Sequence, residues 1–180
     1  MFIAQRLRQE NIVEWIIYMW QVEDVIRAFG FDIERIEREY LTRFDVDDEQ
    51  LEAMLRWYGH LIDMMRVEGR QTSGHLQIIS GVMILLTDLH LQLLASTKFP
   101  FYNAAYYKAL PYIVEVRSRG ADTSKGELES ALEALYGVLL LRMRGKPVSD
   151  ETSAAVGEIS AFLGMLADYY TKDKNNELDL

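Results

Sequence analysis

The chain has 180 residues, a formal net charge of −9, a pI near 4.9 and no cysteine. This length suits one domain that buries enough apolar surface to fold without metal or disulfide staples. The absence of cysteine excludes thiol nucleophiles, redox pairs and thiolate metal sites. The acidic balance argues against a nucleic-acid partner, because affinity for phosphate backbones comes mainly from clustered Lys and Arg.

The location expected from the sequence is the cytoplasm. Glu10 and Glu14 interrupt the apolar character of the N-terminus, so no secretory signal is expected. The longest strongly apolar stretch, Ile78 to Leu86, is shorter than the about 20 residues that a bilayer span needs. We therefore expect no membrane partner.

Apolar residues recur with a period near 3.6 along most of the chain, which predicts an all-α fold. One helix is expected over 3–29, ended by a glycine, and a shorter one over 32–44. The next should begin at Asp47 or Asp48, because Asp47 and Gln50 have the spacing of a capping box. Its apolar stripe consists of Leu51, Met54, Leu55, Tyr58, Leu61, Ile62 and Met65.

The helix expected over 74–96 is the most apolar, so it should be central and covered by its neighbours. A further helix should start near Pro100, which suits a first-turn position. Pro111 lies inside this helix and should kink it or split it in two, because proline removes one backbone hydrogen bond.

The C-terminal part predicts two more helices. "SKGE", which begins at Ser124, has capping-box spacing and should open a helix that ends at Gly145. The last helix should run from Ser149 to about Tyr170. Together the elements predict a single-domain bundle of six or seven mostly antiparallel helices over 1–171, followed by a polar, frayed tail over 172–180.

Several stretches together resemble a known family: "YMWQVEDVIRAF", "GHLQIISGVMILLTDLHLQLL", "KFPFYNAAYYKALPYIVE", "ALYGVLLLRMRGK" and "FLGMLADYY". The family comprises bacterial all-helical proteins of about this length and is classed as a domain of unknown function. The resemblance covers nearly the whole chain. It implies an all-helical single domain in a bacterial intracellular setting, and it implies no activity, cofactor or catalytic residue.

The first helix carries one polar stripe. On a helical wheel Glu14 and Asp24 fall on it, whereas Glu23 and Arg27 lie on the other side as an i,i+4 pair. The stripe is typical of a buried helix with one solvated seam. The alternative is that Glu14 and Asp24 line a polar interior site, where burial would raise their pKa values and suit one of them to acid or base work.

The apolar helix expected over 74–96 also carries two candidate residues for a polar interior site, Asp88 and His90. Asp88 belongs to a second polar seam, and His90 points the opposite way among apolar residues, so the two form no local dyad. A histidine in an apolar stripe is usually a core residue whose ring nitrogens are hydrogen-bonded. Each of the two residues is nevertheless a candidate member of a polar interior site with a group on another helix.

No motif predicts a metal, a cofactor or a catalytic residue. Glu-x-x-His, His-x-x-x-His and His-Glu-x-x-His are all absent, which removes the main support for di-iron and zinc sites. His60 and Asp63 are the only histidine and carboxylate at i,i+3 spacing, and they fall on a polar helix face. There is no nucleophile elbow and no phosphate-binding loop.

The helix after Pro100 is rich in tyrosine. Tyrosine has an apolar body and a polar tip, so it suits cores, interfaces and ligand clefts alike. Core packing, a surface for association and the wall of a small-molecule pocket all stay open for this helix. The candidate interface or pocket residues are Tyr102, Asn103, Tyr106, Tyr107 and Lys108.

The sequence therefore leads to two hypotheses about function. The first is a non-enzymatic cytoplasmic protein that acts through helix-mediated association, as a homodimer, because apolar and aromatic residues are in surplus and no catalytic set is complete. The alternative is a small-molecule-binding protein or enzyme with an acidic and tyrosine-lined site between helices.

Overall fold

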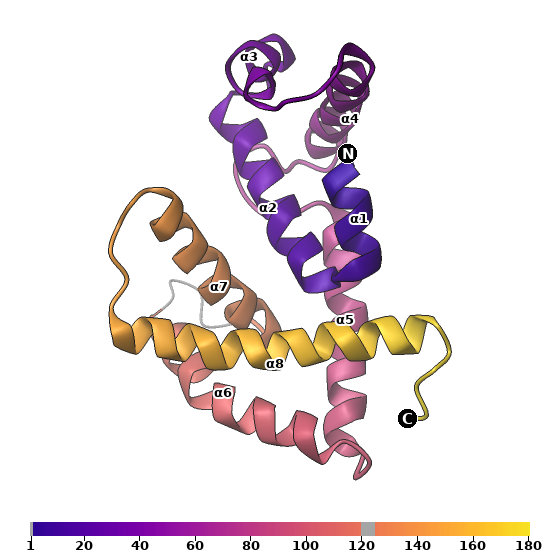
Figure 1. Ribbon diagram of the computed structural model, residues 1–180, viewed down its shortest axis with the longest axis vertical. Coiled ribbons are helices and arrows are strands. Elements are labelled where there is room, and N and C mark those ends of the chain that lie inside the picture. The colour runs from indigo at the N-terminus through magenta and orange to yellow at the C-terminus, as the bar shows by residue number, and fades with distance from the viewer. Residues whose placement is uncertain (1, 120–124) are drawn as a thin grey trace. The chain divides into compact units, whose positions relative to one another are not determined.

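The computed structural model describes residues 2–119 and 125–180, and every regular element in these ranges is helical (Figure 1). The all-α prediction is confirmed. The described residues form eight α-helices and one short 3-10 helix, against the six or seven helices expected. The elements are α1 (Phe2–Glu10), α2 (Ile12–Ala28), α3 (Ile33–Glu39), η1 (Leu41–Arg43), α4 (Asp48–Val67), α5 (Gln77–Ala95), α6 (Pro100–Arg119), α7 (Glu127–Met143) and α8 (Asp150–Lys174).

The chain divides into two compact units. Unit 1 comprises Met1–Gln9 and Glu14–Gly81, and unit 2 comprises Glu10–Val13 and Val82–Leu180. Helix α5 begins in unit 1 and ends in unit 2. The single domain expected over 1–171 stays a prediction.

The N-terminal segment forms two helices, so the expectation of one helix over 3–29 was wrong. Asn11 separates α1 from α2, and its side-chain Oδ1 accepts a hydrogen bond from the backbone N–H of Val13 at 3.1 Å. Asparagine competes with the helix for backbone donors and favours helix starts, so a new helix begins at Ile12. The apolar period continues across this break, which is why periodicity did not reveal it.

Helices α3 and α4 begin at acidic caps. Asp32 accepts hydrogen bonds from two backbone N–H groups of the first turn of α3. Asp47 and Gln50 form the predicted capping box at the start of α4. The single helix expected over 32–44 was wrong at its C-terminal end, because α3 stops at Glu39 and a separate 3-10 turn, η1, follows it.

The core face of α4 matches the predicted stripe. Met54, Tyr58, Leu61, Ile62 and Met65 are buried, and the remaining two members of the stripe are half-buried. The Tyr58 ring lies edge-on to the ring of Tyr40, with a centroid distance of 6.4 Å. Burial raises the pKa of Tyr58, and burial raises the pKa of nearby Tyr18 to about 12. These two phenols of unit 1 therefore remain protonated at neutral pH.

Helix α5 is only partly covered, although we expected the most apolar helix to be buried by its neighbours. Ile84, Leu85 and Leu91 keep 62%, 55% and 57% of their surface exposed. By length and composition, α5 is the one helix among the described residues that is long and apolar enough to cross a membrane, although the core helix of a soluble protein passes the same test. The apolar stretch that we expected to end at Leu86 is extended by further leucines to the end of the helix.

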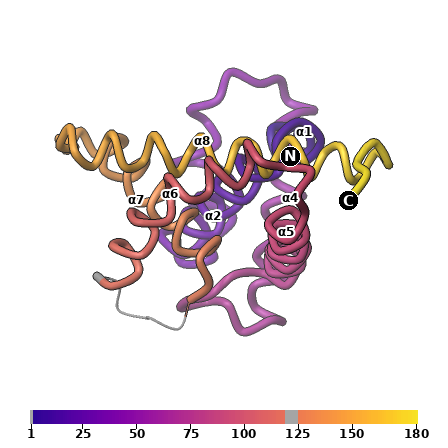
Figure 2. Tube along the Cα trace, turned by 90° about the horizontal axis from the view of Figure 1, so that it is seen from below, coloured from indigo at the N-terminus to yellow at the C-terminus, as the bar shows by residue number. Residues whose placement is uncertain are grey.

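In unit 2, α6 packs along α8 and α7, and α7 also contacts α8 (Figure 1; Figure 2). Helices α6 and α8 run in opposite directions (Figure 1). Helix α6 continues through Pro111 as one helix, so of the two expected outcomes, a kink or a split, the split does not occur. Proline removes only its own N–H bond, and the buried stripe of this helix holds the turns on either side in place. The stripe consists of Tyr102, Tyr106, Ala109 and Ile113.

The ends of α7 and α8 mostly follow the predicted signals. Gly126 is the N-cap of α7, and the predicted cap, Ser124, lies outside the described residues. Ser149 caps α8 by accepting a hydrogen bond from the N–H of Thr152 at 3.1 Å. Helix α8 continues past Tyr170 to Lys174. In the tail, the Asp179 carboxylate lies 2.7 Å from the Lys98 ammonium, so the segment expected to fray makes an exposed ion pair.

Candidate functional site

An open cavity of about 600 Å³ lies in unit 2, between α5, α6 and the start of α7. Most of its wall comes from α5, where His90 and Leu94 follow Thr87 at i+3 and i+7 and therefore share one helix face. The apolar part of the wall consists of Met83, Ile84, Leu91, Leu94 and Leu128. The polar and aromatic groups that line it are Thr87, Asp88, His90, Tyr106, Glu127 and Glu129.

His90 and Tyr102 form the buried hydrogen bond of this site. His90 is 4% exposed, and its Nδ1 lies 2.6 Å from the hydroxyl oxygen of the fully buried Tyr102. Burial raises the pKa of Tyr102, so the phenol keeps its proton, and we assign its hydroxyl as the donor and Nδ1 as the acceptor of this bond. With this assignment the neutral imidazole carries its own proton on Nε2.

The charge state of His90 follows from its surroundings. Burial lowers the pKa of His90, and the nearby carboxylate of Glu127 offsets only part of that shift. The ring is therefore neutral at pH 7. It lies edge-on to three aromatic rings, those of Tyr102, Tyr106 and Phe162, at centroid distances of 5.8, 5.0 and 5.5 Å. These contacts fix the orientation of the imidazole.

Tyr106 connects this cluster to the start of α7. Its hydroxyl donates a hydrogen bond of 2.6 Å to Oε2 of Glu127, the first residue of that helix. Burial and this bond to a carboxylate both raise the pKa of Tyr106. The arrangement places a neutral donor, His90, and a carboxylate, Glu127, on the wall of the same cavity.

The structure brings together residues from both candidate sets of the sequence. His90 from the interior set meets Tyr102 and Tyr106 from the tyrosine set, and Asp88 lines the cavity at an exposed position. Glu127 was missed. It lies far along the chain from α5 and its role as a first-turn acid of a helix is common, so no local signal distinguished it.

The other members of the tyrosine set do not line the cavity. Tyr107 and Lys108 are exposed on α6, and Tyr107 keeps 64% of its surface accessible. Asn103 is half-buried, and its Oδ1 is buried without a hydrogen-bond partner among the described residues.

The structure places Glu14 and Asp24 at exposed positions of α2 in unit 1. Neither is therefore an interior carboxylate in the described chain. Asp24 pairs with Arg27 at 3.1 Å. The carboxylate that α2 buries is Glu23, with 0% of its surface exposed, although the helical wheel had placed it opposite the polar stripe as a partner of Arg27.

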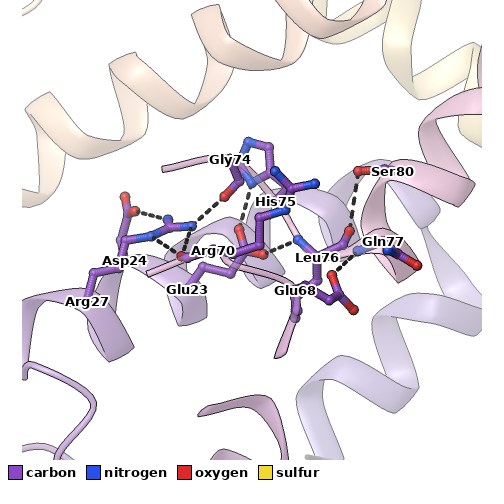
Figure 3. Close-up of polar contacts among 10 residues, drawn as sticks. All are labelled: Glu23, Asp24, Arg27, Glu68, Arg70, Gly74, His75, Leu76, Gln77 and Ser80. Carbon is purple, nitrogen blue, oxygen red and sulfur yellow. Dashed lines mark hydrogen bonds and ion pairs between the residues drawn. The ribbon is translucent and has the colours of Figure 1, made fainter. Parts of the chain in front are cut away.

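Glu23 holds the segment that precedes α5 (Figure 3). Its Oε1 accepts a hydrogen bond from the backbone N–H of Leu76 at 2.8 Å, and its Oε2 lies 2.6 Å from His75 Nδ1. The indole of Trp20 stacks on the His75 ring, with a centroid distance of 4.6 Å and an angle of 14°. Because Leu76 is itself fully buried, Glu23 satisfies a backbone donor that water does not reach.

Arg27 holds the same segment one helical turn further along α2 (Figure 3). Its guanidinium donates hydrogen bonds to the carbonyl oxygen of Arg70, at 3.3 Å, and to that of Gly74. Gly74 has a φ of 78°, a left-handed conformation that favours glycine. This anchoring explains why α5 begins at Gln77 and not at Gly74 as expected: the residues before it follow the contacts of α2.

No group of three or more His, Cys, Asp or Glu side chains in the described ranges could hold a metal ion. The described part of unit 2 contains a mainly apolar cavity that is lined by the buried His90 and by several carboxylates. The fold and this cavity define an all-helical protein with a pocket of small-molecule size.

The chain belongs to the family described as a domain of unknown function, DUF4924, whose family model matches residues 1–177. The resemblance seen in the sequence is thereby confirmed. No curated protein and no solved structure matches the chain.

Proposed function

We propose that this protein binds a small organic molecule in the cavity of unit 2. The observation that carries the proposal is that His90 and Glu127, which both contact Tyr106, line the same mainly apolar cavity. Small-molecule sites usually occupy roughly 300–1,000 Å³ and combine apolar walls with a few polar groups. The cavity, at about 600 Å³, has both properties.

A blocking variant tests this proposal. Thr87 is exposed and lines the cavity, so Thr87→Trp places an indole in it without removing a core side chain. The matched control is Gln92→Trp, at an exposed position of the same helix that does not line the cavity. The probe is N-phenyl-1-naphthylamine, a neutral apolar dye whose fluorescence rises when it leaves water.

We expect the dye to bind the natural protein and Gln92→Trp with equal affinity, and to bind Thr87→Trp at least about tenfold more weakly. Equal dye binding by all three proteins would contradict the proposal. Native mass spectrometry of untagged protein, purified without chelator, then identifies any molecule that copurifies with the chain.

The exposed apolar residues favour a second function, association of the protein with itself. Leu85 of α5 is 55% exposed, and Phe101 and Tyr107 of α6 are 81% and 64% exposed. Contiguous apolar patches on a surface often mark a protein interface, and our second proposal is that these three residues belong to one such patch. We propose a cytoplasmic homodimer that uses these residues, with no nucleic acid, membrane, metal or cofactor required.

The oligomeric state tests this second proposal. Leu85 and Tyr107 do not line the cavity, so Leu85→Ser and Tyr107→Ser test association without changing the cavity wall. Sedimentation velocity at low micromolar concentration should give a dimer for the natural chain and a larger monomer fraction for each variant. A natural chain that sediments as a monomer would rule out the homodimer under these conditions.

A further inference from the structure

The charges around the cavity of unit 2 are one-sided. Asp88, Glu127 and Glu129 line it, and no Lys or Arg is found among its described lining residues. Lys125, the lysine nearest to Gly126 along the chain, is paired with Glu133. Among the described residues, the wall of the cavity therefore carries three carboxylates and no basic side chain.

The start of α7 does not balance these charges. Free N–H groups at a helix N-terminus act as about half a positive charge, and Glu127 and Glu129 both lie in the first turn of this helix. Half a positive charge against three carboxylates leaves a clear negative balance. An anionic ligand would be repelled by this balance at close range, whereas a cation would be attracted by it.

His90 adds no positive charge at neutral pH, because burial keeps its imidazole neutral. His90, which is only 4% exposed, is instead a neutral and buried polar side chain that lines the cavity. The Tyr106 ring stands beside it, and aromatic faces attract cations. A buried neutral imidazole and an aromatic ring therefore line the cavity together with the three acids.

Most of the remaining wall is apolar. Met83, Ile84, Leu91, Leu94 and Leu128 surround the same space, so the body of a ligand that fills it is apolar or aromatic. A strongly hydrated inorganic cation would gain nothing from these side chains. An amine with an apolar body would use both the apolar wall and the carboxylates.

We propose that the cavity binds an organic cation, an ammonium group attached to an apolar body. The ammonium is neutralised by Asp88 and Glu127, and the body lies against the leucines of α5 and α7. This inference rests on the proposed small-molecule function and names the class of ligand.

Three probes of similar size test the inference: 4-phenylbutylamine, 4-phenyl-1-butanol and 4-phenylbutanoate. Each carries a phenyl ring on a four-carbon chain, and they are cationic, neutral and anionic at pH 7, respectively. Each is titrated against the protein carrying N-phenyl-1-naphthylamine, and displacement of the dye gives its affinity. We expect the amine to bind at least about tenfold more tightly than the alcohol, and the carboxylate to bind most weakly.

Charge-neutral variants identify the carboxylates involved. Asp88→Asn and Glu127→Gln should each bring the affinity of the amine towards that of the alcohol. In Glu127→Gln the new side-chain amide oxygen can still accept the hydrogen bond from Tyr106, so the cavity wall keeps its shape. Asp168→Asn is the matched control, because Asp168 is an exposed acid of unit 2 that does not line the cavity. It should leave all three affinities unchanged.

The outcomes separate the inference from the function on which it rests. Equal affinities for amine and alcohol, or tightest binding of the carboxylate, would overturn the cation proposal. If Thr87→Trp still weakens dye binding in that case, small-molecule binding stands and only the ligand class is wrong. Dye binding that is insensitive to Thr87→Trp removes both proposals.

Discussion

Replacing Glu23 by alanine removes the one side chain that satisfies the backbone N–H of Leu76. Glu23 and Leu76 both have 0% of their surface exposed, so water does not take the place of the lost carboxylate. The second bond, to His75, disappears as well. We therefore expect Glu23→Ala to destabilise unit 1 more than a typical substitution of an acid in a helix.

The magnitude follows from these contacts. A buried donor left without a partner costs about 1–3 kcal/mol, and the bond to His75 adds about 1 kcal/mol. The higher helix propensity of alanine offsets a few tenths of a kcal/mol of this loss in the free energy of unfolding. The expected loss is about 3 kcal/mol. With a urea dependence of roughly 2 kcal/mol per molar, the midpoint of unfolding falls by about 1.5 M.

Tryptophan fluorescence measures this loss where it occurs. All three tryptophans, Trp15, Trp20 and Trp57, belong to unit 1, and Trp20 stacks directly on His75. Urea unfolding followed by tryptophan emission therefore reports on the unit that contains Glu23. The slope of the transition should stay the same in the natural protein and the variant, so that the midpoint alone carries the change.

Two further variants make the prediction specific. Glu23→Gln keeps an acceptor for the N–H of Leu76 and should lose about half as much stability. Glu52→Ala removes an acid of α4 whose pair with Arg56 is exposed, at 3.2 Å, and should change the free energy of unfolding by less than about 0.5 kcal/mol. The reasoning fails if Glu23→Ala is no more destabilising than Glu52→Ala.

Three other predictions follow from the pKa shifts and the caps. Burial lowers the pKa of His90 from 6.5, so the unfolded chain protonates this residue at a higher pH than the folded protein does. The stability that the neutral ring contributes is complete above pH 6.5 and is lost as the pH falls towards the pKa of the folded protein. An NMR titration that gives a pKa of 6.5 or more for His90 would contradict this prediction. Burial raises the pKa of Tyr18 from 10.0 to about 12, so the contribution of its phenol to stability is present below pH 10 and is lost as the pH rises towards 12. In an alkaline titration followed by ultraviolet absorbance, Tyr18→Phe should remove the ionisation step near this pKa. An unchanged titration would refute the assignment. Asp47→Ala removes the side chain that accepts a hydrogen bond from the backbone N–H of Gln50, so it should lower the free energy of unfolding, measured in urea, by about 1 kcal/mol. A variant as stable as the natural chain would show that this cap is dispensable.

Much of the fold was predictable because its signals are local. The caps at Asp47 and Ser149 depend on side chains that lie within three residues of the backbone groups they bind, so spacing alone reveals them. The break at Asn11 is equally local, but an unbroken apolar period concealed it. The burial of Glu23 was not predictable in this way, because it depends on a backbone N–H that lies 53 residues further along the chain.

The candidate site was predictable only in part. His90 and Tyr102 are separated by the same number of residues from Ser96, which lies in the turn between α5 and α6. A hairpin of these two helices therefore brings the two side chains together, and this symmetric spacing is visible in the sequence. The two residues were nevertheless placed in separate sets. Glu127 belongs to α7, the helix that follows α6 in the chain. Its position beside the other two residues depends on how the helices of unit 2 pack, which no local sequence pattern describes.

The two proposed functions both involve α5. Ile84 and Leu91 line the cavity and, like Leu85 of the proposed interface, are exposed apolar residues of this helix. A second copy seated on α5 would cover the side chains that a ligand in the cavity also contacts. Binding of one would then change the affinity for the other by the same factor in both directions, since linked equilibria are reciprocal. If both proposals hold, the affinity for the dye depends on protein concentration, and Leu85→Ser, which leaves the cavity wall intact, removes that dependence.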